Sequence, residues 1–418
     1  MTPPEYEENR SRLLLTACGF SLAALVAMGG LLLLGLHRPK HQAVVFAPPK
    51  PQVRSAASVD RTAPTTPAGQ ARRTAARRAQ AIAARPAGQA RRTAARRADA
   101  IAADAHGGRL FSLTSIWNQR VAPSAPLDPS SGTLVANLLA EVRRERTTGT
   151  GPLIQAGRAS APLYRVGAGQ ARVRVRLDDR RVPGHTALRR ALAAVPIPAN
   201  AEAGAKLIRY VSIWQPATDT LWELRGARKL ADGWHARWGG AMRKVSRNRG
   251  YYTPAAWRGA TWSWGATPSG LPVAAGAILA DDLRAGRIDH ALAINVPAPR
   301  ADVFAWPAQR TDGDGATPTL PEGAHLRLDP AVDVNSLRLP KLTRMIAAAA
   351  QPYGLVVRGQ DRAISVVGEN PARFRKNPYR KYFLSRTSQQ LLANFPWDRL
   401  QVLQMHLCTA APCAPPSR

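Results

Sequence analysis

The chain has 418 residues, a formal net charge of +32 and ten Trp, all of which lie from residue 117 onward. Residues 1–106 hold 16 Lys and Arg against 6 Asp and Glu, and the remainder holds 43 against 21, so both parts are basic. The near absence of aromatic residues from the first hundred positions excludes a packed core there. The charge favours anionic lipid, acidic wall polymer or nucleic acid as partners, although an Arg-rich solvated surface from biased coding produces the same composition.

A membrane segment is predicted near the N-terminus. After a short tail at residues 1–12, residues 13–36 form a run of 24 residues without a charge. As a helix rising about 1.5 Å per residue, this run crosses a hydrocarbon core of about 30 Å. A cleaved signal peptide has a shorter apolar region, and in a lipoprotein the apolar region would precede Cys18 rather than follow it. We therefore predict a single-pass signal-anchor helix in the cell membrane.

The orientation of this anchor is less determined, because the charges at its two flanks are nearly balanced. The arginines downstream favour a cytoplasmic C-terminus, but long domains translocate largely regardless of charge. We expect the C-terminal domain to be extracytoplasmic.

A linker and a basic repeat follow the anchor. Residues 37–66 are rich in Pro, Ala and Thr and predict a disordered linker. Residues 67–106 contain a 19-residue repeat, in which 67–85 and 86–104 agree at 17 of 19 positions. Helix-forming residues with little to bury predict a solvated stalk, helical or disordered. Alternatively its arginines bind a polyanion, namely lipid headgroups or wall polymer outside the cell, or nucleic acid inside it. These arginines are Arg72, Arg73, Arg77, Arg78, Arg91, Arg92, Arg96 and Arg97.

The rest of the chain predicts a globular domain at residues 107–372 and a basic extension at 373–418. Many short strands with few helices indicate a mainly β fold, an antiparallel β-sandwich or barrel. A hairpin is expected around residues 215–219, and a second one joins the last two strands. Helices are expected over 130–146, 280–285, 339–351 and, with a break at Pro396, over 387–407. Strands are expected over 172–177, 206–214, 220–227, 234–238, 260–264, 291–296, 303–306, 327–328, 354–358 and 363–367.

The cysteine pattern bears on compartment and on cofactors. Cys408 and Cys413 enclose four residues that include a Pro, a spacing that predicts a disulfide loop and an oxidising compartment. No zinc spacing, phosphate loop or dinucleotide fingerprint occurs in the sequence. We therefore expect neither a metal nor another cofactor.

Aromatic residues are the candidates for ligand binding. Trp262 and Trp264 are two positions apart and would share one face of a strand, with Tyr252 shortly upstream. With Trp222 they would line a glycan groove, and packing in the core is the alternative for each of them.

Three polar residues are the candidates for catalysis. Glu223, with Arg225 two positions later, and His290 have the side chains that general acid–base catalysis uses. The alternatives are a structural Glu–Arg ion pair and a structural histidine.

Eight short segments of the chain resemble, in order, a widespread family of secreted or membrane-tethered bacterial proteins that lack an assigned activity. The resemblance covers about residues 110–370 and implies a jelly-roll sandwich of the lectin/glucanase kind. The family pattern commonly has an Asp-x-His pair in the strand that here spans 205–210, and this chain lacks that pair. The segments are residues 115–118, 195–199, 219–224, 232–234, 270–273, 285–292, 306–308 and 353–355.

These features predict a membrane-anchored extracytoplasmic protein that binds cell-surface glycan or another polyanion. The first alternative is an enzyme on the same fold, a glycoside hydrolase or polysaccharide lyase. The second is a membrane-tethered nucleic-acid binder acting through the Arg repeats, and nucleic acid is the least expected of these partners.

Overall fold

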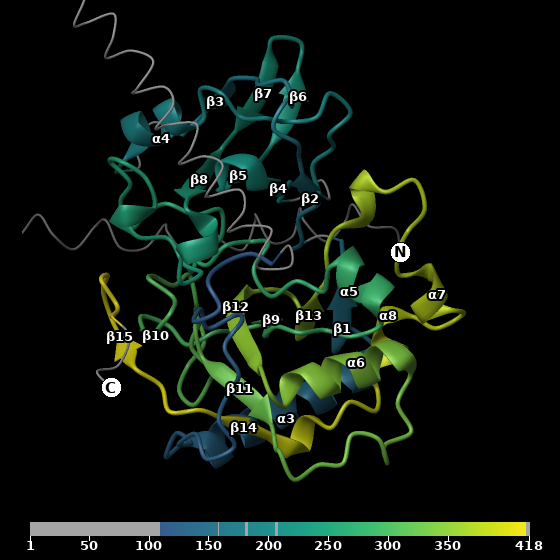
Figure 1. Ribbon diagram of the computed structural model, residues 1–418. Helices are drawn as coiled ribbons and strands as arrows, with labels where there is room; N and C mark the ends of the chain where they lie inside the picture. The colour runs from purple at the N-terminus through teal and green to yellow at the C-terminus, as the bar shows by residue number, and fades with distance from the viewer. Residues whose placement is uncertain (1–108, 158, 180–182, 205–207, 415–418) are drawn as a thin grey trace, which may run out of the picture. The chain divides into compact units, whose positions relative to one another are not determined.

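The computed structural model describes residues 109–414 except 158, 180–182 and 205–207 (Figure 1). These residues form a mainly β structure with several mixed sheets and few helices, which confirms the predicted class. Within the described ranges, no helix is both long enough and apolar enough to cross a membrane. The expected anchor at residues 13–36, the linker and the Arg repeat lie outside the described residues.

Residues 163–243, here called the Trp-rich segment because they include four Trp, form two sheets that share one hydrophobic core. The predicted hairpin is confirmed, since β4 and β5 pair antiparallel with Ile213 opposite Trp222. A short 3-10 turn, η1 (Pro216–Thr218), connects them. The first sheet contains, in spatial order, β2 (Leu163–Arg165), β4 (Val211–Gln215), β5 (Thr220–Arg225) and β8 (Trp238–Arg243). The second contains β3 (Val175–Leu177), β7 (Gly233–Ala236) and β6 (Arg228–Leu230). A short helix, α4 (His185–Ala191), lies between β3 and β4 in the chain.

A six-stranded sheet separates this core from a second one. Ala293 and Val356 belong to the core of the Trp-rich sheets, whereas their neighbours Ile294 and Val357 belong to the other core. Because successive side chains of a strand point to opposite faces, the sheet is buried on both sides. In spatial order its strands are β1 (Leu153–Gln155), β13 (Ser365–Val367), β9 (Leu292–Val296), β12 (Leu355–Gln360), β11 (His325–Leu328) and β14 (Leu400–Val402).

Helices complete the second core. The helix predicted over residues 130–146 is α3 (Ser131–Thr148), which buries Leu134, Leu138 and Val142. It ends at Gly149 in a left-handed conformation. α3 packs on β14, α6 (Lys341–Ala350) on β9 and β11, and α8 (Ser388–Leu392) on β1. α5 has the predicted bounds, Ala280–Ala285. The remaining elements are α7 (Arg380–Phe383), β10 (Phe304–Ala305), β15 (Leu407–Cys408), η2 (Val245–Arg247), η3 (Pro254–Ala256), η4 (Pro371–Arg373) and η5 (Trp397–Arg399).

Strand pairing departs from the expected antiparallel sandwich. Four pairs are parallel, namely β1–β13, β2–β4, β3–β7 and β9–β12. The predicted final hairpin is wrong, because β9 lies between β12 and β13. The turn after β12 does reverse the chain, but both strands form their ladders with the buried β9 instead of with each other.

Two further expectations are corrected. Residues 260–264 form a loop instead of a strand. The expected C-terminal helix is limited to α8 near its start, because the chain beyond Pro396 forms η5 and then β14, which pairs with β11. A disulfide joins Cys408 in β15 to Cys413, with an S–S distance of 2.08 Å.

Candidate functional site

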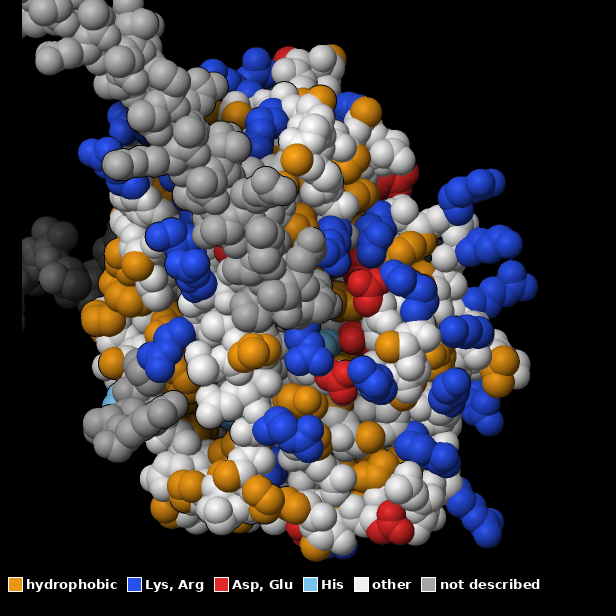
Figure 2. All heavy atoms as spheres, viewed as in Figure 1, with side chains coloured by type: hydrophobic (Ala, Val, Ile, Leu, Met, Phe, Trp, Pro, Cys, Tyr) orange, Lys and Arg blue, Asp and Glu red, His pale blue; other side chains and the backbone are white. Residues whose placement is uncertain are grey.

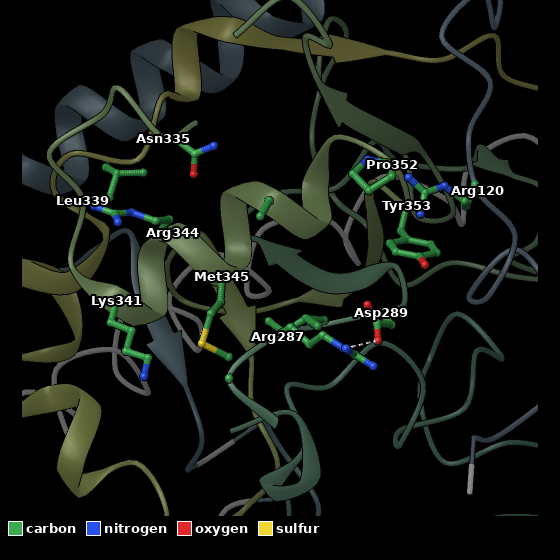
Figure 3. Close-up of a pocket in the computed structure, with 13 residues that line it drawn as sticks. Arg120, Arg287, Asp289, Asn335, Leu339, Lys341, Arg344, Met345, Pro352 and Tyr353 are labelled. Carbon is green, nitrogen blue, oxygen red and sulfur yellow. Dashed lines mark hydrogen bonds and ion pairs between the residues drawn. The ribbon is translucent and has the colours of Figure 1, made fainter. Parts of the chain in front are cut away.

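A pocket of about 750 Å³ lies beside α6 (Figure 3). This volume lies within the range of small-molecule sites. Its walls come from the loop before α3, the segment after α5, the segment before α6 and both ends of α6 itself. We call it the basic pocket, and it is lined by Arg120, Gly286, Arg287, Ile288, Asp289, Asn335, Leu339, Lys341, Arg344, Met345, Ala348, Pro352 and Tyr353.

Positive charge dominates this pocket. Four cationic side chains line it, and Asp289 is its one carboxylate. That carboxylate is already neutralised, because Asp289 Oδ2 lies 2.7 Å from Arg287 Nε and 3.6 Å from Arg109 Nη2. Within the described part of the chain, no ion pair engages the other three cations, which are exposed. An anionic ligand would therefore meet uncompensated charge at Arg120, Lys341 and Arg344.

The spacing of residues along α6 produces one wall. Lys341, Arg344 and Ala348 lie at intervals of three and four residues and so share one helix face. The opposite face, with Leu342 and Ile346 among others, is buried in the second core. The helix thus holds two cations at fixed positions, and the small side chain of Ala348 leaves room beside them.

An aromatic and apolar surface lies across the pocket from these cations. Arg120 Cζ lies 5.3 Å from the centroid of the Tyr353 ring, a cation–π contact that orders the guanidinium. Met345 lies between this pair and the Lys341 side of the pocket (Figure 3). Met345 and Tyr353 are both largely buried, so they add only a small apolar surface between the separated cations.

His290 lines a smaller pocket of about 210 Å³, which shares Arg287 and Asp289 with the basic pocket. Both nitrogens of its imidazole face acceptors: Nδ1 lies 2.8 Å from the Ala291 carbonyl oxygen and Nε2 lies 3.0 Å from Asp282 Oδ2. An imidazole that donates from both nitrogens is an imidazolium. This arrangement leaves no lone pair for a general base and makes the His290–Asp282 contact an ion pair.

Opposing effects act on the pKa of His290. Burial lowers it, but the charge and hydrogen bond of Asp282, with the Ala291 carbonyl, outweigh burial and raise the pKa above its ordinary 6.5. The imidazolium therefore contributes stability below the unfolded-state pKa, and this contribution is lost as pH rises through the raised folded-state pKa.

Asp282→Asn should lower the pKa of His290, because it removes the charge while keeping an acceptor for the Leu279 N–H. The stability difference between wild type and variant should be largest below pH 6.5 and should shrink at higher pH. An NMR titration of His290, with denaturant unfolding at a series of pH values, measures both. An unchanged pKa in the variant would contradict the ion pair.

Glu223 is fully buried between β4, β8 and the loop that follows residue 272. Its Oε2 accepts hydrogen bonds from Val273 N (2.9 Å) and Tyr252 OH (3.3 Å), and its Oε1 accepts them from Ala274 N (2.9 Å) and Ser212 Oγ (3.2 Å). Burial raises the pKa of Glu223, while these four donors oppose the rise. A carboxylate enclosed in this way braces a loop and is closed to substrate.

The other predicted site residues are not gathered with His290. Trp222, Tyr252 and Trp264 are buried in the core and present no ring face to a ligand, while Trp262 is half-buried. The shared strand face expected for Trp262 and Trp264 is absent, because that segment is a loop.

The Arg310 guanidinium contacts the backbone of that loop. The carbonyls of Trp262 and Trp264 both accept hydrogen bonds from the Arg310 guanidinium, at 2.7 and 3.0 Å. Arg225, at the end of β5, is half-buried.

Sequence reasoning missed the basic pocket. The positions of Lys341 and Arg344 on one face of a predicted helix were a usable signal. Arg120 and Arg287 have no such signal, because they reach the pocket from distant segments, whereas Tyr353 lies just after the end of α6. The eight repeat arginines expected to bind polyanions lie outside the described residues.

Comparisons with protein-family models, curated proteins and solved structures find no match for this chain. The resemblance noted in the sequence therefore stays a prediction.

Proposed function

We propose that this protein binds an acidic glycan, or a similar anionic polymer of the cell surface, in the basic pocket. The observation that carries the proposal is the set of four cations around about 750 Å³, opposed by a single carboxylate that two arginines already neutralise. Such a site attracts negative charge, and it holds enough space for more than one simple anion.

The distribution of the cations favours an extended ligand. Figure 3 shows Arg120 on one side of the pocket and Lys341 and Arg344 on the other, with Met345 between them. A compact phosphate would be gripped by cations that converge on one point. Separated cations around the small apolar surface of Tyr353 and Met345 instead match a chain of sugars whose acidic groups recur at intervals and whose ring faces are apolar.

The predicted anchor at residues 13–36 would place this pocket at the cell surface, where acidic polymers are found. A jelly roll, as in lectins, is built of antiparallel strands, whereas four strand pairs here are parallel. The fold therefore adds no support for glycan binding.

A polysaccharide lyase is the second candidate, and one observation favours it over a hydrolase. Glycoside hydrolysis normally uses two carboxyl groups, and the basic pocket has only the paired Asp289. A lyase instead needs cations that neutralise a uronate, a base that removes the C5 proton as the C4–O bond breaks, and an acid that protonates the departing O4. Tyr353 lies among such cations. Growth of ultraviolet absorbance from an unsaturated uronate product would establish this activity.

The test compares polygalacturonate with its full methyl ester, which has the same backbone without the charge. We expect the full-length protein to bind the acid form and not the ester, and to bind less tightly as salt is raised. Equal binding of both forms would overturn the proposal.

A further inference from the structure

A second positively charged surface adjoins the Lys341 side of the basic pocket, on the segment around α7. No Asp or Glu occurs between Glu369 and Asp398, whereas six Lys and Arg lie within residues 373–386, here called the basic loop. Lys and Arg side chains project along the right-hand edge of Figure 2, where Figure 1 places α7. The six are Arg373, Arg375, Lys376, Arg380, Lys381 and Arg386.

Only one of these six cations forms an ion pair with a described residue. Arg373 pairs with Glu369, with Nε 2.6 Å from Oε1. For the other five cations no ion pair is formed with any described residue, and all five are exposed. The basic loop therefore presents at least five uncompensated cations to whatever lies outside it.

Two tyrosines fix the loop to the domain. The Tyr379 hydroxyl shares its one proton between the Ile278 and Glu369 carbonyls, at 2.9 and 3.1 Å. The Tyr382 hydroxyl donates to the Leu283 carbonyl. Both rings are buried. The backbone that carries these cations is therefore fixed relative to the rest of the domain, unlike that of a free tail.

Leu384 is the feature that selects among anionic partners. Its side chain is 71% exposed, and its backbone has φ 51°, in a region that a bulky side chain rarely occupies. Exposure and strain both disfavour leucine at this position in water. The Leu384 N–H donates to the Arg380 carbonyl at 3.1 Å, so the backbone conformation closes the end of α7. The exposed apolar side chain is therefore the feature that bears on the choice of partner.

We propose that the basic loop docks on an anionic lipid surface, with Leu384 entering the boundary between headgroups and acyl chains. Cations beside an exposed apolar residue are the arrangement by which proteins lie on such membranes. A soluble polyanion would satisfy the cations but would leave Leu384 in water. This inference stands apart from the glycan proposal, although Lys341 of the basic pocket adjoins the loop, with Nζ 5.7 Å from the Tyr382 ring centroid.

Hydrogen exchange of the full-length protein with vesicles tests the docking locally, so that binding by other basic segments does not interfere. Amides of residues 379–386 should exchange more slowly with vesicles of equal parts phosphatidylglycerol and phosphatidylcholine than with phosphatidylcholine alone. Equal exchange in the two would overturn the proposal. So would equal protection by soluble polyphosphate without vesicles, which would make the loop a general polyanion site.

Two variants separate charge from insertion. Arg375→Gln with Lys376→Gln should raise the lipid concentration for half-maximal protection roughly 25-fold, at about fivefold per near-surface charge. Leu384→Asn should raise it about tenfold while leaving thermal stability equal or higher, because Asn tolerates positive φ. Arg189→Gln with Arg190→Gln on α4 removes the same charge elsewhere and should change nothing. Unaltered protection in Leu384→Asn would contradict insertion.

Discussion

Glu223→Ala should lower the free energy of unfolding by about 3–5 kcal/mol. The substitution leaves the Val273 and Ala274 N–H groups buried without an acceptor, and each such group costs about 1–3 kcal/mol. It also opens a cavity in the core and removes a partner of the Tyr252 hydroxyl. Denaturant unfolding followed by Trp fluorescence measures the change.

Two controls distinguish this bracing role from a general sensitivity to losing an acid. Tyr252→Phe removes one of the four donors and should cost about 1 kcal/mol. Glu141→Ala removes a carboxylate that pairs with Arg144 on the surface of α3, and it should cost less than about 0.5 kcal/mol. A loss below about 1 kcal/mol in Glu223→Ala would show that the loop does not depend on this carboxylate.

Lys341→Ala with Arg344→Ala should weaken binding of a short oligogalacturonate about 100-fold. A hydrogen bond to a charged group contributes about 1.5–3 kcal/mol, so each lost contact costs at least about tenfold. The helix should remain intact, because both positions are exposed and alanine is the best helix former. Isothermal titration at physiological salt measures the affinity while screening exposed charges elsewhere in this basic chain.

The matched control for the pocket is Arg189→Ala with Arg190→Ala, which removes the same charge from the exposed side of α4. Its affinity should stay within about twofold of wild type. If both double variants weaken binding equally, the protein attracts the ligand through its overall charge and the basic pocket is not the site.

Local patterns predicted the elements whose stabilising contacts are close in the chain. α5 was predicted at its true bounds because acidic residues in its first turn and Gly286 after its last turn mark both ends. The β4–β5 hairpin was predicted because its turn and both strands are contiguous. The β12–β13 hairpin failed because each strand pairs with β9, sixty or so residues earlier, and no local signal records that partner.

For the candidate site too, the sequence indicated the residues, whereas contacts with distant segments decided their roles. Glu223 and His290 were noticed for their side-chain chemistry, but their roles depend on the groups that enclose them. Two backbone N–H groups about fifty residues away close Glu223 to solvent, and Asp282 with the Ala291 carbonyl occupies both nitrogens of His290.

Composition and short-range pattern were sufficient to establish a basic chain with a long apolar run near its start, a repeat, a mainly β domain and closely spaced cysteines. These properties depend on residue type and on neighbours within a few positions. Strand order, the burial of three predicted ligand-binding aromatics and the meeting of Arg120, Arg287, Lys341 and Arg344 around one pocket were decided by tertiary structure. They depend on which distant segments bury their apolar faces together, and a single chain's local pattern does not encode that choice in a readable form.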